Sequence, residues 1–421
     1  MKRARFFKIT FILIFLLLIF LYISNITLFP ENFLIFSHET LNISLLPGLE
    51  IKQISSSNPN LNSLNRFKAI QVSNGAENEN ISGQIKLSLN LFGQFPLKDI
   101  TVNVIPKSTV IPVGNTVGLK LYTNGVLVVG MSEIEGEDNK KYKPYENSGI
   151  EEGDMITDIN EKKITCTTDL IECVNSSQGK SLKITYVRDS NQLETNITPT
   201  KTTENEYKLG LWVRDAAAGV GTVTFYDPET QTFAALGHGI MDIDTQQLIN
   251  ISKGEVVTTN LLSITKGEKG KPGEIKSTIE DGKTIGEVYK NTAFGIYGTL
   301  KNKAYLEIDK SKAMDVAIRE EVKVGKATIL CAIQNSKPQE YEIEITKVYT
   351  NNNYNNKSME IKITDPKLLE LTGGIIQGMS GSPILQGGKF IGAVTHVLVS
   401  DPTRGYGVFA DLMLKQIKSV E

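Results

Sequence analysis

A serine held between glycines is the pattern in this chain most able to do chemistry. Residues 378–383 read Gly-Met-Ser-Gly-Ser-Pro, with Ser380 at their centre. Gly378 has no Cβ, so a carbonyl group can approach its N–H closely. The N–H groups of Gly378 and Ser380 can then form an oxyanion hole, which stabilises the charge that develops when a hydroxyl attacks a carbonyl. The alternative interpretation is a glycine-rich hairpin turn in a β protein.

A histidine that can act as the base lies well before this serine. The chain has three histidines, and His238 stands in the sequence Ala-Ala-Leu-Gly-His-Gly, directly after an apolar strand. The stretch between His238 and Ser380 is long enough for one small barrel, which predicts the base on a first barrel and the nucleophile on a second. Catalytic residues on the strand-joining loops of a rigid scaffold are a common arrangement. We expect His238 and Ser380 to form a catalytic pair, and we interpret His396 as a structural histidine.

Composition argues against several other classes of protein. The net charge of −2 gives no indication of nucleic-acid binding. Cys166, Cys173 and Cys331 lack metal-ligand spacing, and their odd number argues against a disulfide framework. Cys331 lies in an apolar, strand-like segment and is expected to be a core residue. The sequence therefore predicts neither a metal site nor a cofactor.

The amino terminus carries the membrane signal of this chain. Four basic residues among the first eight precede an apolar run over residues 9–23. No clear Ala-x-Ala cleavage site follows. We expect residues 1–29 to be an uncleaved membrane anchor, with its positive charges in the cytoplasm and everything after it outside; slow or partial cleavage is the alternative. Residues 30–104 are predicted to be a polar tether, with two strands within 83–104.

Residues 105–200 carry a different signature. Ser148-Gly149-Ile150 followed by Gly153-Asp154-Met155-Ile156 resembles the A-G-L-x-x-G-D-x-I pattern of PDZ domains, and a helix over 168–174 fits their order of elements. In a PDZ domain the loop containing Val117, Gly118 and Leu119 is expected to offer backbone N–H groups to a peptide carboxylate. The peptide itself is expected to add as a strand. The alternative is a PDZ domain with a purely scaffolding role.

Residues 201–421 are predicted to be all-β apart from a short terminal helix over 411–417. Two antiparallel barrels with the active site between them accommodate this pattern. The turn around Ser380 resembles the nucleophile turn of chymotrypsin-like serine proteases. The expected fold is mainly β: a membrane anchor, a PDZ domain and a chymotrypsin-like double β-barrel. The predicted strands are 209–213, 220–226, 232–236, 293–300, 304–308, 326–332, 341–348 and 358–363.

The region from about residue 84 to the end resembles the SpoIVB peptidases, the stage IV sporulation protein B enzymes of endospore-forming Firmicutes. The resemblance implies a serine endopeptidase in the space between the forespore and mother-cell membranes. It implies cleavage of a membrane-bound regulator of an intramembrane protease that processes the sigma-K precursor, and self-processing. The matching segments are 105–106, 111–114, 148–156, 209–215, 219–221, 236–242, 374–386, 392–397 and 405–409.

The resemblance also points to Asp365 as the acid of a Ser/His/Asp triad. Its spacing departs from that of chymotrypsin relatives, whose acid lies nearer the base, and Asp242, Asp244 and Asp281 are rivals. The alternative role of Asp365 is an N-cap, because Pro366 follows it. Two non-enzyme alternatives remain for the whole chain: a catalytically inactive PDZ adaptor, and a membrane-anchored structural protein of the envelope.

Overall fold

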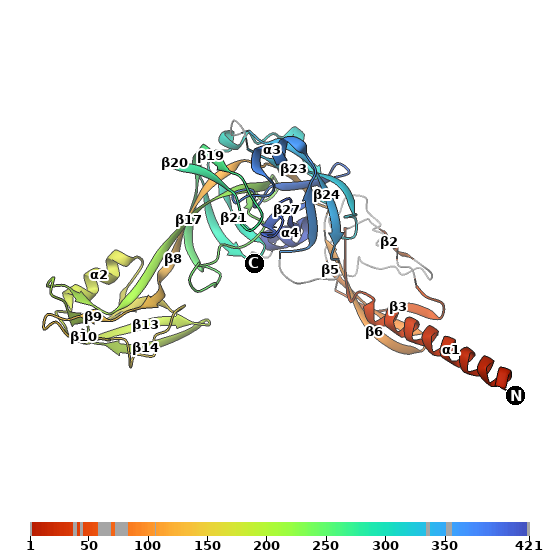
Figure 1. Ribbon diagram of the computed structural model, residues 1–421, viewed down its shortest axis with the longest axis horizontal. Coiled ribbons are helices and arrows are strands. Elements are labelled where there is room, and N and C mark those ends of the chain that lie inside the picture. Colours follow the sequence, from red (N-terminus) through yellow and green to blue (C-terminus); the bar gives the residue numbers. More distant parts are fainter. Residues whose placement is uncertain are drawn as a thin grey trace. The chain divides into compact units, whose positions relative to one another are not determined.

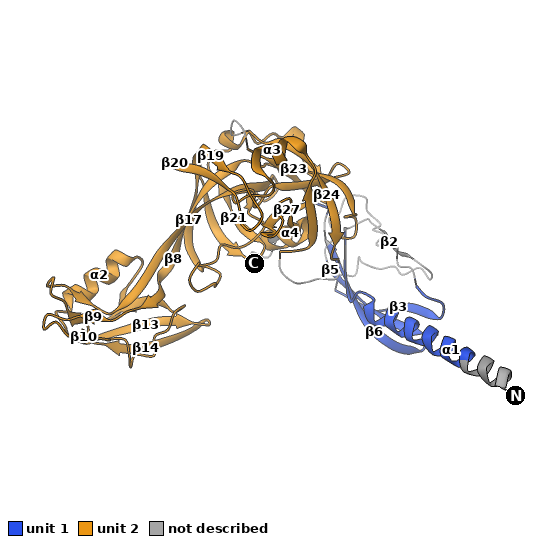
Figure 2. Ribbon diagram, viewed as in Figure 1, with its two compact units in different colours: residues 1–108 blue, residues 109–421 orange. Residues whose placement is uncertain are grey.

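The computed structural model describes residues 2–36, 40–42, 45–57, 69–71, 83–105, 107–333, 337–350 and 356–418. The chain divides into two compact units, residues 1–108 and 109–421 (Figures 1 and 2). The predicted tether and anchor fall in the first unit. The predicted PDZ and peptidase regions fall together in the second.

The first unit joins the apolar helix α1 to a small β-sheet. Residues 10–28 of α1 have a mean hydropathy of 2.6, so the helix is long and apolar enough to cross a membrane. The sheet has the order β1-β6-β5-β3 and buries alternate residues such as Leu87 and Leu89. The two predicted strands within 83–104 are confirmed, but residues 32–36 and 49–56 join them. The elements are α1 (Lys2–Leu28), β1 (Asn32–Phe36), β2 (Thr40–Asn42), β3 (Leu49–Ser56), β4 (Ala69–Gln71), β5 (Gly83–Leu91) and β6 (Phe95–Ile105).

A ring of six strands forms the first barrel of the second unit. Successive hydrogen-bonded pairs run β8-β19-β20-β21-β18-β17, and β17 returns to β8. Valine, leucine, isoleucine and phenylalanine side chains fill its interior, including Phe233 and Ile296. The elements of this barrel and the segments next to it are β7 (Thr109–Pro112), β8 (Thr116–Met131), β17 (Leu211–Asp227), β18 (Thr232–Ala235), β19 (Ile251–Thr265), β20 (Glu274–Thr292), β21 (Gly295–Leu300), η1 (Ala304–Leu306), η2 (Lys310–Lys312) and β22 (Met314–Asp315).

A closed six-stranded barrel follows in the order β23-β24-β25-β28-β27-β26. Alternation along β24 buries Tyr341, Ile343 and Ile345 and exposes the residues between them, as expected for a barrel wall. The predicted double-barrel, mainly β fold is therefore confirmed. The elements are β23 (Gly325–Cys331), β24 (Gln339–Val348), β25 (Met359–Ile363), α3 (Pro366–Thr372), β26 (Pro383–Gln386), β27 (Lys389–Val397), β28 (Arg404–Phe409) and α4 (Ala410–Lys418).

The PDZ domain is inserted between the two long strands β8 and β17. Its core packs α2 against the sheet through Leu170 and Val174. Asp154 of the signature is 1% exposed and accepts two hydrogen bonds from Arg188, each at 2.7 Å, which explains the acidic residue in that pattern. The elements are β9 (Ile134–Glu135), β10 (Lys141–Tyr142), β11 (Met155–Ile159), β12 (Lys162–Lys163), α2 (Thr167–Ser176), β13 (Leu182–Arg188), β14 (Asn191–Ile197), β15 (Thr200–Lys201) and β16 (Tyr207–Lys208).

The structure corrects two expectations from the sequence and adds one element that the sequence did not predict. Val117, Gly118 and Leu119 are not a peptide-binding loop: they lie inside β8, paired with β17 on one side, and the latter two also with β19 on the other. Residues 304–308 do not form a strand but the short 3₁₀-helix η1, which ends at Glu307 in the left-handed conformation. The long hairpin β19–β20 was not predicted, because glycines and charged residues interrupt its alternation.

Candidate active site

Ser380 lies in the turn that leads into β26 of the second barrel. The turn is held by hydrogen bonds from the N–H of Met379 to Ile376 O at 3.1 Å and from the N–H of Ser382 to Met379 O at 2.9 Å. Met379 is fully buried, whereas Ser380 is partly exposed. The buried neighbour anchors the turn and leaves the hydroxyl accessible. Ser380 Oγ donates to the carbonyl oxygen of Thr395 at 2.8 Å.

Thr222 of the first barrel fastens the nucleophile turn to that barrel. Its N–H donates to Ser380 O at 3.1 Å, and its Oγ1 donates to Gly378 O at 2.7 Å. Thr222 O in turn accepts from the N–H of Leu236, two residues before His238, at 3.1 Å. Gly381 has a φ of 96°, and a Cβ there would clash with Thr222 O and the Leu236 backbone. One buried threonine thus connects the serine turn and the histidine turn.

His238 follows β18 at the end of the first barrel, as predicted. Gly237 packs tightly, because a Cβ on it would come 3.1 Å from side-chain atoms of Thr395 and Val408 in the second barrel. His238 Nδ1 lies 2.9 Å from Gly239 O. A carbonyl oxygen only accepts, so Nδ1 carries the hydrogen and Nε2 of the neutral ring is left to accept a proton. Burial lowers the pKa of His238, which keeps the ring neutral.

Two backbone N–H groups of the serine turn are available to an incoming oxygen. Within the described residues, the N–H groups of Gly378 and Ser380 donate to no hydrogen-bond acceptor. Gly378 has a φ of 98°, in the left-handed region that favours glycine. A Cβ on Gly378 would come 3.0 Å from Ile275. These are the two donors that the sequence predicts for an oxyanion hole.

His396 lies against the ring of His238. The two ring centroids are 5.1 Å apart, with the planes 37° apart. His396 Nδ1 is buried and has no hydrogen-bond partner among the described residues. Burial, the neighbouring His238 and Lys357 lower the pKa of His396 to about 4. Ser380 bonds to Thr395 and the ring of His238 lies against that of His396, so these two consecutive residues of β27 contact both the nucleophile and the base.

Asp365 lies at the N-cap of α3. Its Oδ1 accepts from the N–H of Leu368 at 2.9 Å, and its Oδ2 from the N–H of Glu342 at 3.4 Å. The N-cap alternative for Asp365 is thereby confirmed. Within the described residues, no hydrogen bond joins Asp365 to His238, and the hydrogen-bond partner of His238 Nδ1 is Gly239. The role of Asp365 as the triad acid stays a prediction of the family resemblance.

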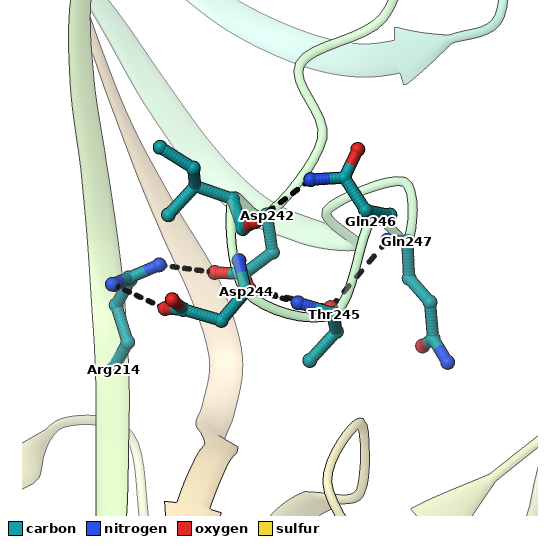
Figure 3. Close-up of polar contacts among 7 residues, drawn as sticks. Arg214, Asp242, Asp244, Thr245, Gln246 and Gln247 are labelled. Atoms are coloured by element: carbon teal, nitrogen blue, oxygen red, sulfur yellow. Dashed lines mark hydrogen bonds and ion pairs between the residues drawn. The ribbon is translucent and has the colours of Figure 1, made fainter.

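The rival carboxylates follow His238 in a loop that Arg214 holds. Arg214 of β17 donates to Asp242 at 2.5 Å and to Asp244 at 2.8 Å, and Figure 3 shows it reaching both from one side of the loop. Burial opposes the charge on Asp242, but the N–H of Thr245 and the Arg214 guanidinium outweigh it, so the pKa of Asp242 lies below its ordinary value. Both carboxylates are thus committed to Arg214. The side chain of Asp281 lies outside the described part of the chain.

A free strand edge in the PDZ domain lies beside α2. Residues 211–214 of β17 pair with β8 and with no other described strand. Leu211 and Val213 pack on the same apolar cluster as α2, and the N–H of Thr167, at the start of α2, donates to Asp215 at 2.6 Å. Strand and helix therefore flank one site where a peptide can add as a strand. The preceding Leu209-Gly210, with Gly210 at a φ of 76°, replaces residues 117–119 as the candidate carboxylate loop.

Sequence reasoning did not identify Thr222 or the contact of His396 with His238. Thr222 lies in an alternating strand, and nothing in its neighbours marks the hydroxyl that reaches a loop far along the chain. The link from Arg214 to the loop after His238 was also not identified from the sequence. Its signal was a single cation in an otherwise small and apolar stretch, followed by two aspartates close after His238.

Cys331 is confirmed as a core residue. It is 1% exposed on β23, and burial raises the pKa of its thiol. A buried thiol of raised pKa carries little thiolate at neutral pH, so it is a poor nucleophile. Cys331 therefore does not compete with Ser380 as a nucleophile.

Two protein families match parts of this chain. Residues 205–414, about half of the chain, match the SpoIVB peptidase S55 family, and residues 115–198 match the PDZ domain family. A crystal structure of the PDZ domain of an SdrC-like protein from Listeria monocytogenes is 21% identical over 21% of this chain and 87% of its own, with a TM-score of 0.17. The HtrA-type protease AlgW with a decapeptide is 9% identical over 73% of this chain and 64% of its own, with a TM-score of 0.31. The chain is a serine endopeptidase of the SpoIVB type that contains a PDZ domain.

Proposed function

We propose that Ser380 and His238 cleave peptide bonds as nucleophile and general base. Ser380 Oγ attacks the scissile carbonyl while His238 Nε2 takes the hydroxyl proton. The N–H groups of Gly378 and Ser380 stabilise the oxyanion. His238 then returns the proton to the leaving amine, and water hydrolyses the acyl-enzyme in a second cycle of the same transfers.

One observation carries this proposal: Ser380 contacts Thr395 and His238 contacts its neighbour His396, although Ser380 and His238 belong to different barrels. In the structure Ser380 Oγ donates to Thr395 O, so the hydroxyl must turn its hydrogen from Thr395 toward His238 before the proton can be transferred. Catalytic hydrogen bonds are often formed only when substrate is bound. Gly239 O orients the imidazole here, and Asp365 is the acid that the family resemblance adds.

Purified full-length protein tests the catalytic pair. We expect Ser380→Ala and His238→Ala each to abolish cleavage of casein, and the double variant to be as inactive as either single one, because such residues act as a unit. A serine-directed phosphonate should label wild type and not Ser380→Ala. Circular dichroism controls for folding. Near-normal cleavage by either folded single variant contradicts the mechanism.

We further propose that α1 anchors the enzyme in a membrane with its PDZ and peptidase domains outside the cytoplasm, in the forespore intermembrane space. Support comes from the apolar span of α1 and the basic residues that precede it. A reporter that is active only in the cytoplasm, fused after residue 100, should give no signal. A strong reporter signal refutes this orientation.

We also propose that this chain has the sporulation role of the family. The enzyme would cleave a membrane-bound regulator of an intramembrane protease and so activate processing of the sigma-K precursor. An endospore former lacking its own enzyme should regain sigma-K processing with this chain and not with Ser380→Ala. If wild type cleaves casein but does not restore processing, the peptidase activity stands and the signalling role does not.

Finally, we propose that the enzyme cuts its own chain within residues 30–80, and that peptide binding at β17 helps to select the cleavage site. Gly374 precedes Ser380 by six residues, where chymotrypsin-like folds form the base of the primary specificity pocket. A Cβ on Gly374 would clash with Pro402 O, so this position has no room for a carboxylate that attracts Lys or Arg. Amino-terminal sequencing of a shortened form made by wild type and absent in Ser380→Ala is the test. Cuts only after Lys or Arg overturn the pocket argument.

A further inference from the structure

The tip of the β5–β6 hairpin is apolar and exposed in a way that folding does not explain. Residues 91–97 read Leu-Phe-Gly-Gln-Phe-Pro-Leu and contain no charge. Phe92 is 68% exposed, Phe95 61% and Leu97 41%. Phe92 has a φ of 50°, a conformation that favours glycine or asparagine over a bulky residue. The backbone at Phe92 is therefore strained, and Phe92 lies outside the buried core of the sheet.

The hairpin tip lies beside the last turns of α1. Tyr22 of α1 donates its hydroxyl hydrogen to Pro47 O at 2.9 Å, and the next residue, Gly48, accepts from the N–H of Phe92 at 2.7 Å. Figure 1 shows β3 and β6 running along the same end of the helix. Tyr22 precedes Leu28, the end of the apolar span, by six residues, which is about 9 Å along a helix.

A second, independent set of contacts places the hairpin tip at the same depth along α1. Lys98 of β6 donates to Thr27 O at 3.2 Å and to Phe29 O at 2.6 Å, so its ammonium group lies at the carboxyl end of α1. From Lys98, β6 leads back to Phe95 over three residues, about 10 Å of extended chain. Phe95 and Phe92 thus lie about one and a half to two helical turns inside the end of the apolar span.

We propose that residues 92–97 insert into the lipid bilayer at the boundary between headgroups and acyl chains, next to α1. This inference rests on the proposed membrane anchoring by α1. A depth of about 10 Å inside the end of the span is the deep limit of the roughly 5–10 Å by which interfacial apolar surfaces enter the headgroup and acyl boundary, a zone that favours aromatic side chains. Glu50 and Lys52 flank Gly93 of the tip, and Lys52 donates to the Gly93 carbonyl. A charge of each sign thus borders the apolar tip, which suits contact with zwitterionic lipid headgroups. Insertion would hold the first sheet on the membrane surface.

Tryptophan fluorescence of the full-length protein in phosphatidylcholine vesicles tests the proposal. Trp212 is the only tryptophan of the chain, so Trp212→Phe provides a dark background. Phe95→Trp places the probe at the tip. Ile54→Trp is the matched control, because Ile54 is 58% exposed on β3, next to the residues that pair with the far end of β5. Phe20→Trp reports α1 itself.

We expect lipids brominated near the headgroup to quench Phe95→Trp several-fold more than Ile54→Trp, and lipids brominated deeper to quench Phe20→Trp most. Quenching of Phe20→Trp without quenching of Phe95→Trp overturns the inference and leaves the anchor standing. Absence of quenching in both rejects the anchor and the inference together. Emission of Phe95→Trp that shifts with protein concentration and not with brominated lipid assigns the tip to a contact between chains, and also overturns it.

Discussion

The rings of His238 and His396 lie against each other, with their centroids 5.1 Å apart and their planes tilted by 37°. The contact crosses from the loop after the first barrel to β27 of the second. It shields the ring of His238 from water, and burial is the main cause of the lowered pKa of this histidine. The contact therefore contributes to the burial that favours the neutral form of the base.

The acid limb of the pH profile of kcat/KM should lie below the ordinary histidine pKa of 6.5. His396→Ala removes the covering ring and should move this limb upward, toward 6.5. His396→Phe keeps an apolar ring in place and should leave the limb where it is in wild type. An acid limb with a pKa above 6.5 in wild type, or the same pKa in the Ala and Phe variants, would contradict burial as the cause of the lowered pKa of His238.

Acid should also destabilise the fold through His396. Its pKa is about 4 in the folded protein, against about 6.5 in an unfolded chain. Between these values the unfolded state binds more protons, so stability rises with pH across this window and is lost as pH falls from about 6.5 to about 4. His396→Phe should flatten the dependence of the denaturation midpoint on pH in this range, relative to wild type. A slope that is unchanged would mean that other groups dominate.

The nucleophile and base could be predicted from sequence because both lie in glycine-rich turns directly beside strands. Ser380 and His238 depend on local backbone shape, which short motifs record. The PDZ signature is local for the same reason, since Asp154 pairs with Arg188 within one small domain. Such features can be recognised in a sequence without knowing how distant segments pair.

Features that depend on distant pairing could not be predicted. Val117–Leu119 look like a loop motif, but their partners in β17 and β19 lie about a hundred residues or more away in sequence. Asp365 has a local explanation, the cap of α3, and a distant one, the triad, and the sequence alone does not choose between them. The clamp by Thr222 depends on a strand meeting a turn of the other barrel.

Thr222→Val tests that clamp against a matched neighbour. The substitution removes the hydrogen bond to Gly378 O and leaves that buried carbonyl unpaired, which should cost about 1–3 kcal/mol of stability. It should also lower kcat, since Gly378 supplies an oxyanion donor. Thr224 lies on the same strand, and its buried Oγ1 has no described partner, so Thr224→Val should be neutral or stabilising. Thermal unfolding and kcat are the measurements, and equal effects of the two variants would sink the argument.

Asp365→Asn separates the cap of α3 from the triad acid. Asparagine caps helices as well as aspartate does, so stability should stay unchanged, whereas Asp365→Ala should lose about 1 kcal/mol. Both carboxylate oxygens are engaged away from His238 in the structure. Turnover of Asp365→Asn within a few-fold of wild type would restrict Asp365 to the cap. The proposed triad role predicts a loss approaching ~10⁴-fold at unchanged stability. It would also require the carboxylate to leave the cap when substrate binds.

Arg214→Ala should loosen the loop that follows His238. Asp242 is 1% exposed and would lose its cation, while the N–H groups of Asp244 and Thr245 still bind it. We expect amides of residues 240–248 to exchange hydrogen ~10- to 100-fold faster, equivalent to ~1–3 kcal/mol of local stability, and kcat/KM to fall. Asp244→Ala is the control: its carboxylate is 45% exposed, and exposed pairs contribute under about 1 kcal/mol. If exchange in the loop is unchanged in Arg214→Ala, or equally raised in both variants, Arg214 does not position the histidine loop through Asp242.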